Sequence, residues 1–321
     1  MTNIRDIARM ANVSVTTVSR VINEHPYVSE EKREAVLRAM ERADYQVNMT
    51  AVHLSQGKSQ LIGVVVPFAN HPYFGLLIEG IAKKAVESNY HFVLIQTNYN
   101  KEREQEALDM LRHKQIDGLI ICSRISGLDT ITKYRQYGKI VICENAKGNR
   151  TIDSVYIDHY QSFLSALKYL YEKGYRNIGY SIGRETGSNS YFRQQAYRDF
   201  LKQKDLPYQE SFVFTENYNL EDGQKVVNLI QQLFHKPDAL LVTSDVVAAG
   251  IITACNHTNL RVPEDLAIIG FDNQPIAKMM GITTFEIPLV TMGEKLFQQV
   301  IRTTSTAHQQ FHVTLIERNT V

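Results

Sequence analysis

Apolar residues in the first 45 positions recur at helical spacing and are interrupted by short polar turns. The first stripe has the i, i+3, i+4, i+7 spacing of an amphipathic helix and consists of Ile4, Ile7, Ala8 and Ala11. Residues 12–14 break the pattern, and Ser14 is a good N-cap for a second helix with the apolar stripe Val15, Val18, Val21 and Ile22. Two short helices joined by a three-residue turn are typical of a helix-turn-helix.

A third helix completes this all-α head, and a linker follows it. Ser29 is the predicted N-cap, and the predicted buried stripe consists of Val36, Leu37, Met40 and Ala43. We expect the head to span residues 1–46 and the linker residues 47–59. Within the linker, Asn48 can cap a helix of fewer than ten residues that ends near Leu54. A helix this short is marginal in water on its own.

From Leu61 onward, apolar runs typical of buried parallel strands alternate with amphipathic helices. The first series predicts strands at 61–66, 92–96, 118–122 and 140–143, with helices at 75–88, 102–113 and 129–137. The second series predicts strands at 177–181, 211–215, 239–243 and 266–270, with helices at 160–173, 192–202, 221–234 and 246–256. The fold class is therefore an α/β core of two parallel-sheet lobes. Such sheets bind ligands in the crevice at the carboxyl ends of their strands.

The outward face of the second helix carries groups that match DNA bases. Its polar side chains are Thr16, Thr17, Ser19, Arg20 and Asn23. Arginine pairs with guanine, hydroxyls pair with either partner, and a side chain such as Val15 contacts a thymine methyl. The alternative is a solvated helix on an ordinary small bundle.

Composition indicates an ordinary globular protein, with 44% apolar residues and a net charge of +1 over 321 residues. No charged n-region followed by an apolar segment opens the chain, and no stretch reaches the length of a membrane span, so we expect a cytoplasmic protein without membrane contact. Residues 1–58 hold 8 Lys and Arg against 7 Asp and Glu. A head with so little net charge is expected to neutralise few DNA phosphates.

The cysteines and histidines lack the spacing of a metal or redox site. Cys122, Cys143 and Cys255 are scattered and are expected to be buried free thiols. The ten histidines form no HExxH or paired ligand set, and no phosphate-binding glycine loop is present. We therefore expect no metal and no cofactor.

Several motifs together resemble the lactose-repressor (LacI/GalR) family of bacterial transcription regulators, and the match looks closest to its catabolite-control branch. The head carries VSVTTVSRVIN at 13–23 and YVSEEKR at 27–33. The core carries HPYF at 71–74, IDGLII at 116–121, RQQAY at 193–197, TSDVVAAG at 243–250 and IIGFDN at 268–273. The resemblance implies a core like periplasmic binding proteins at 60–321, with an N-lobe of about 60–159 and 289–307 and a C-lobe of about 160–288 and 308–321.

The resemblance also implies which residues contact DNA. It places Val15, Thr16 and Arg20 at base edges, and Thr17, Ser19 and Asn23 near phosphate or base. Asn48 leads the hinge helix, and Leu54 matches the family's wedge leucine, which enters the central base step from the minor groove together with its dimer mate. The implied protein is a homodimeric repressor of carbohydrate or catabolite genes that binds a pseudopalindromic operator on double-stranded DNA.

For the cleft between the lobes, the resemblance implies an effector site. Its matched positions are Asn70, Tyr73, Phe74, Glu144, Arg193, Tyr218, Ser244 and Asp272. The effector is either a small molecule, a sugar or sugar phosphate, or the serine-phosphorylated phosphocarrier protein HPr, which governs relatives in the catabolite-control branch. Either would favour one arrangement of the lobes.

Two other functions fit parts of the sequence. Residues 179–183 (GYSIG) match the nucleophile elbow G-x-S-x-G, but a polar loop follows where that motif needs a sharp turn into a helix. A sugar-binding protein on the same two-lobed core, without DNA regulation, is the second alternative. The helix-turn-helix head and the lack of a signal-peptide pattern argue against this second alternative.

Overall fold

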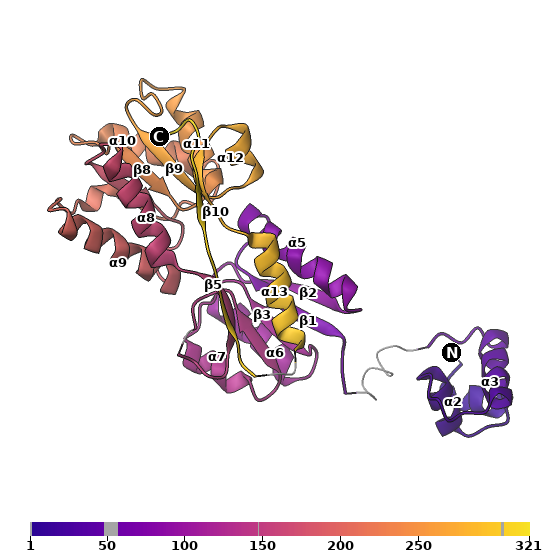
Figure 1. The fold of residues 1–321 in the computed structure, drawn as a ribbon. Helices are drawn as coiled ribbons and strands as arrows, with labels where there is room; N and C mark the ends of the chain where they lie inside the picture. Colours follow the sequence, from indigo (N-terminus) through magenta and orange to yellow (C-terminus); the bar gives the residue numbers. More distant parts are fainter. Residues whose placement is uncertain (1, 48–56, 147, 303–304) are drawn as a thin grey trace. The chain divides into compact units, whose positions relative to one another are not determined.

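The computed structural model describes residues 2–47, 57–146, 148–302 and 305–321. Its contacts divide the chain into two compact units, residues 1–60 and residues 61–321, which are drawn in Figure 1. Among the described residues, no helix is both long and apolar enough to cross a membrane.

The first unit is a three-helix head at the predicted positions, with α1 (Ile4–Met10), α2 (Val15–Ile22) and α3 (Glu30–Arg42). Asn3 caps α1 in a capping box with Asp6, and the Ser14 hydroxyl accepts the Thr17 N–H at 3.1 Å to begin α2. Asn12 has a φ of 53° and ends α1 in the left-handed conformation that asparagine tolerates. The buried core of the head consists of Ile7, Ala8, Val18, Val21, Val36 and Ala39.

Two predicted members of the apolar stripes face solvent instead. Leu37 is 51% exposed, and Ala39 is buried in its place. The stripe of α3 is therefore Val36, Ala39, Met40 and Ala43, which keeps the i, i+3, i+4, i+7 spacing that Leu37 breaks. Val15 is 41% exposed because it opens α2 at the surface.

The N-lobe contains a six-stranded parallel sheet in the order β11-β5-β4-β3-β1-β2. Its strands are β1 (Leu61–Val66), β2 (His91–Gln96), β3 (Gly118–Ile121), β4 (Lys139–Ile142), β5 (Asp153–Ile157) and β11 (His308–Phe311). Helices α5 (Pro72–Glu87) and α13 (Leu289–Ile301) share one hydrophobic core with this sheet, and α6 (Lys101–Arg112) and α7 (Leu128–Tyr134) share another. Adjacent strand residues such as Val64 and Val65 belong to opposite cores, as expected of a strand buried on both faces.

The C-lobe repeats this architecture with the order β12-β10-β9-β8-β6-β7, in which only β12 is antiparallel to its neighbour. Its strands are β6 (Ile178–Ser181), β7 (Val213–Phe214), β8 (Ala239–Val242), β9 (Ala267–Asp272), β10 (Thr283–Glu286) and β12 (Thr314–Ile316). Its helices are α8 (His159–Glu172), α9 (Ser188–Gln203), α10 (Asp222–Gln232), α11 (Asp245–Cys255) and α12 (Pro275–Met279), with a short 3-10 turn at Glu210–Phe212.

The chain crosses between the lobes after β5, after β10 and after β11 (Figure 1). The last crossing corrects the expected lobe boundary, because His308–Phe311 pairs with β5 and belongs to the N-lobe sheet. Strands β5, β10, β11 and β12 and helices α12 and α13 are not among the predicted elements. The strands read DSVYI, TTFE, HQQF and TLI, which are too short and too polar to show strand periodicity. The three cysteines are buried free thiols, as predicted.

Candidate DNA-reading face and ligand cleft

Helix α2 presents part of the predicted DNA-reading set to solvent. Thr16 and Arg20 are exposed, and Val15 is exposed beside them. Within the described part of the chain, no hydrogen bond or ion pair holds the Arg20 guanidinium, so its donors are available to a ligand. This face combines a methyl, a hydroxyl and a guanidinium group, the types that read base edges in a major groove.

The other predicted DNA-binding residues are less exposed or are not described. The Thr17 hydroxyl lies 2.9 Å from the Ser14 hydroxyl, and Asn23 donates its side-chain N–H to the Ser19 carbonyl oxygen at 2.8 Å. These contacts stabilise the two ends of α2. Asn48 and Leu54 lie outside the described residues, so the hinge helix and the wedge remain predictions.

A cavity of about 120 Å³ lies in the core, where the carboxyl ends of strands from both lobes converge. It is lined by residues that follow β1, β2 and β3 in the N-lobe and β6, β8 and β9 in the C-lobe. This is the position expected of a ligand site in open parallel sheets. The cavity wall brings together six of the eight predicted effector residues: Tyr73, Phe74, Arg193, Tyr218, Ser244 and Asp272.

Asp272 is held in the wall by a strained loop. Its φ is 102° and that of Asn273 is 52°, so both residues lie where L-amino acids are rare. The carboxylate of Asp245 anchors this loop by accepting the Gln274 N–H at 2.7 Å and the Thr284 hydroxyl at 2.6 Å. The Gln274 side chain in turn donates to Asp272 Oδ2 at 2.9 Å. Strain of this kind persists only where surrounding contacts over-determine the conformation, which is typical of ligand sites.

Burial controls the charges in this wall. It raises the pKa of Asp272 well above 3.8, with Asp245 adding to the shift and Arg193 opposing it. Burial lowers the pKa of Arg193, and Asp272 opposes that shift. Burial and the Arg193 charge hold the pKa of His159 well below 6.5, so its imidazole is neutral. Arg184 and His71 also line the cavity, so the site faces its ligand with one carboxyl group, two guanidinium groups and two imidazoles.

Aromatic rings form the other side of the cavity. Phe68 from the N-lobe lies 5.4 Å from Tyr218 of the C-lobe and 5.5 Å from Tyr99, measured between ring centroids. Burial raises the pKa of Tyr218 to about 12, so its hydroxyl stays protonated at neutral pH. Flat apolar rings facing polar groups suit a ligand that has both an apolar face and hydroxyl groups.

Glu144 and Asn70 are not among the residues that line the cavity. The buried Glu144 carboxylate pairs with Arg124 at 2.9 Å and accepts a hydrogen bond from the Ser188 hydroxyl of the C-lobe. Beside it, Arg184 of the C-lobe donates to the Arg124 carbonyl oxygen at 3.0 Å and lies over the Tyr99 ring at 4.3 Å. Glu144 therefore takes part in a bridge between the lobes. Asn70 is exposed.

The sequence reasoning missed several residues of this wall. Phe68, Tyr99 and Ser123 follow predicted strands, so their position after a strand was a usable signal. Asn217 likewise follows the strand predicted at 211–215. His159 gave no such signal, because it follows β5, which was not predicted. In the described ranges, no group of three or more His, Cys, Asp or Glu residues could hold a metal ion.

The nucleophile-elbow motif does not form an elbow. Ser181 ends β6, is 1% exposed, and accepts a hydrogen bond from the Asn217 side chain at 3.1 Å. Helix α9 begins only at Ser188, so no sharp strand-to-helix turn presents the hydroxyl.

A helix-turn-helix head followed by a two-lobed core with a polar cleft defines a transcription regulator with a periplasmic-binding-protein-like domain. Family models agree: residues 3–48 match the "Bacterial regulatory proteins, lacI family" and residues 59–319 match the "Periplasmic binding proteins and sugar binding domain of LacI family". The chain belongs to the LacI family. It is a DNA-binding transcriptional regulator and not an enzyme. Its relatives include a transcriptional repressor, which supports the interpretation that this chain is a repressor.

Relatives match over nearly the whole chain. The "uncharacterized HTH-type transcriptional regulator YkvZ" of Bacillus subtilis (strain 168) is 40% identical and covers 100% of both chains. Catabolite control protein B of the same organism is 35% identical over 92% of this chain and 93% of its own. A LacI family regulator from Lactobacillus casei, solved with bound sucrose, is 25% identical with a TM-score of 0.74, over 81% of this chain and 99% of that chain.

Proposed function

We propose that this regulator is a homodimeric repressor of carbohydrate or catabolite genes in the cytoplasm. A single α2 face reads only a few base pairs. Regulators of this kind bind more tightly, and to a longer DNA site, when two heads pair on a pseudopalindrome. The exposed set of Val15, Thr16 and Arg20 supports base reading in each half-site. The similarity to catabolite control protein B supports the class of genes.

We further propose that a small polyhydroxylated molecule, a sugar or sugar phosphate, binds in the cleft as effector. One observation carries this proposal: four buried polar atoms around the cavity have no hydrogen-bond partner among the described residues. They are Arg193 Nε, His159 Nδ1, Ser244 Oγ and Asn217 Oδ1. Buried polar groups are nearly always satisfied, so a cluster of exceptions around one cavity indicates a site built for a polar ligand. The sucrose bound by the Lactobacillus casei relative supports the same ligand class.

Such a ligand would act on the arrangement of the lobes. Arg193 and Ser244 belong to the C-lobe, whereas Tyr73 and Phe68 belong to the N-lobe, so one ligand contacts both. A ligand that binds one lobe arrangement better shifts the population toward it, and a coupling of about 1–3 kcal/mol to DNA affinity would be ordinary.

A serine-phosphorylated phosphocarrier protein, HPr, is the second candidate effector. The 35% identity to catabolite control protein B favours it. The two effectors would bind at different places. A sugar would bind in the cavity, whereas the phosphoprotein would bind on the surface of the protein.

The deciding experiment is selection of binding sites from random duplex DNA by the purified protein. The selection is run alone, with serine-phosphorylated HPr, and with a panel of mono- and disaccharides and their phosphates. A palindrome whose enrichment changes with a sugar supports the cleft effector, and Arg193→Met should abolish that change. A palindrome strengthened only by the phosphoprotein supports HPr instead. Absence of any enriched palindrome would contradict the proposed operator.

A further inference from the structure

The edge of the N-lobe sheet where its parallel strands begin carries many basic side chains. Helices in an α/β lobe run opposite to the strands, so their C-terminal ends and the loops that start strands meet at this edge. We call it the basic edge, and it consists of Lys114, Lys133, Arg135, Lys139, Arg150 and Arg302.

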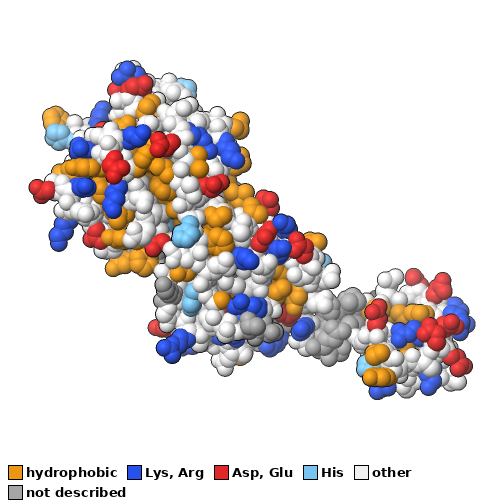
Figure 2. Space-filling model, viewed as in Figure 1, with side chains coloured by type: hydrophobic (Ala, Val, Ile, Leu, Met, Phe, Trp, Pro, Cys, Tyr) orange, Lys and Arg blue, Asp and Glu red, His pale blue; other side chains and the backbone are white. Residues whose placement is uncertain are grey.

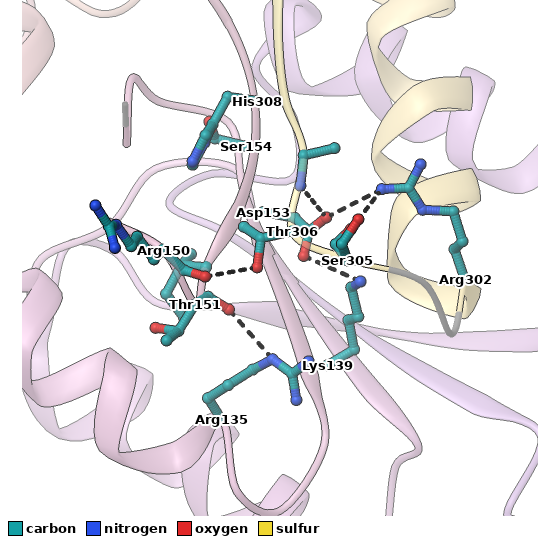
Figure 3. Close-up of polar contacts among 12 residues, drawn as sticks. Arg135, Lys139, Arg150, Thr151, Asp153, Ser154, Arg302, Ser305, Thr306 and His308 are labelled. Carbon is teal, nitrogen blue, oxygen red and sulfur yellow. Dashed lines mark hydrogen bonds and ion pairs between the residues drawn. The ribbon is translucent and has the colours of Figure 1, made fainter. Parts of the chain in front are cut away.

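Hydrogen bonds and ion pairs link the segments that carry Arg135, Lys139, Arg150 and Arg302 (Figure 3). Lys114 donates to the carbonyl oxygen of Tyr137, just beyond α7. Arg135 Nε donates to the Thr151 carbonyl oxygen at 3.2 Å, and the Thr306 hydroxyl donates to the carbonyl oxygen of neighbouring Arg150 at 2.8 Å. The loop from α7, the loop before β5 and the loop before β11 therefore lie side by side.

The acid at the centre of this surface, Asp153, is buried and paired with two cations. Asp153 is 0% exposed, and its carboxylate pairs with Lys139 at 3.1 Å and Arg302 at 3.6 Å while accepting the Ala307 N–H at 3.0 Å. Its single negative charge offsets only one of the two positive charges that it contacts. Lys133 and Arg150 are exposed, and their side chains make no ion pair with any described residue. Figure 2 shows Lys and Arg side chains at this end of the lobe.

At the equivalent edge of the C-lobe, several basic residues are paired with acids. There, Arg261 pairs with Asp265 at 2.8 Å, Lys173 pairs with Glu317 at 3.4 Å, and Asp238 accepts the Arg176 N–H at 3.1 Å. Exposed Lys202 and Lys236 also lie at this edge and form no ion pair with a described residue. The basic edge of the N-lobe differs in that its cations gather around one buried acid, Asp153.

The chain connectivity indicates which polyanion this edge meets. Strand β1 begins at Leu61 on the same edge, directly after the linker from the DNA-binding head. The head and linker carry 8 basic against 7 acidic residues up to Lys58, so they supply little general attraction for phosphates. We propose that the basic edge of the N-lobe binds backbone phosphates of the operator DNA. The core then supplies part of the sequence-independent affinity, and α2 supplies base recognition.

The test is the salt dependence of binding to a selected operator duplex by the full-length protein. Each lost phosphate contact lowers the slope of log affinity against log salt by about 0.9. In the double variant K133Q/R150Q, this slope is expected to fall by about 0.9 for each phosphate contact that a protomer loses. The base preference of the variant is expected to stay unchanged. The matched control is K236Q/K278Q, which removes two exposed lysines from the C-lobe and should keep the wild-type slope.

A wild-type slope in K133Q/R150Q would overturn the proposal and leave the basic edge to an acidic protein partner. An equal loss of slope in the C-lobe control would also overturn it, because net charge alone would then explain the effect. A change in base preference would overturn it too, since phosphate contacts carry no direct sequence information.

Discussion

At the scale of single residues, Arg20 is the side chain most directly matched to a base. It is exposed on α2, and its guanidinium can pair with the two acceptors of a guanine edge. Arg20→Ala is expected to cost about 1–3 kcal/mol of operator binding and to relax preference at one position of each half-site. Titrations against operators that vary one base pair at a time measure both effects. Unchanged preference at every position would remove Arg20 from the reading set.

Asp245 makes stability depend on pH. Burial raises its pKa from 3.8 to about 7, although the Thr284 hydroxyl and the Gln274 N–H act in the opposite direction. A carboxyl group with a raised folded-state pKa binds its proton more tightly in the folded protein. Its contribution to stability is therefore present below about pH 4 and is lost as the pH rises through about 7.

Asp245→Asn is therefore expected to flatten the decline in unfolding free energy between about pH 4 and pH 7. The measurement is urea unfolding of both proteins across that range. Asp265→Asn is a suitable control. Arg261 lowers the pKa of the Asp265 carboxyl group to about 2, so this group does not titrate between about pH 4 and pH 7. Parallel pH profiles for wild type and Asp245→Asn would contradict the assignment.

At the scale of elements, two glycines set the distance between α5 and α13. A Cβ at Gly80 would lie 1.9 Å from the Val290 carbonyl oxygen, and one at Gly293 would lie 2.1 Å from that of Leu77. The helix backbones are therefore in direct contact. Gly80→Ala is expected to cost roughly 1–3 kcal/mol of stability by forcing these helices apart.

Gly75 offers a matched control within α5. A Cβ there meets nothing within 4 Å, so Gly75→Ala should stabilise the helix by up to about 1 kcal/mol. Denaturant unfolding of the two variants distinguishes packing from helix propensity. Equal effects at both positions would contradict the close-contact explanation.

The predicted elements with strong periodicity are confirmed at this scale. The three head helices match their predicted positions closely, because each has its own apolar stripe. Side-chain caps begin α1 and α2, whereas Ser29 makes no side-chain capping hydrogen bond to α3. Strand β10 was not predicted, because its residues Thr283 and Thr284 look solvent-facing in sequence. Both are buried, with hydroxyls engaged by Arg318 and Asp245, partners far away along the chain.

At the scale of the whole molecule, the wedge hypothesis concerns DNA shape. Leu54 lies in the undescribed linker, and its predicted role is to open the central base step at a cost of a few kcal/mol that wider contact offsets. Leu54→Ala is expected to reduce the bend of the bound operator and to weaken binding. Energy transfer between dyes at the operator ends measures the bend. An undiminished bend in the variant complex would contradict the wedge.

By itself, the sequence determined the helix-turn-helix and the two βα series, because local periodicity encodes them. The family resemblance, and not periodicity, indicated the cleft residues, and six of its eight matched positions line the cavity. Only the tertiary structure decided which polar groups lie unpartnered around one cavity, and that Glu144 joins a bridge between lobes. It also decided that His308–Phe311 returns to the N-lobe sheet, where the basic edge surrounds a buried Asp153. These features depend on segments that are distant in the sequence, such as Glu144 and Ser188, 44 positions apart, or Ser154 and His308, 154 positions apart. No local pattern records which of them meet.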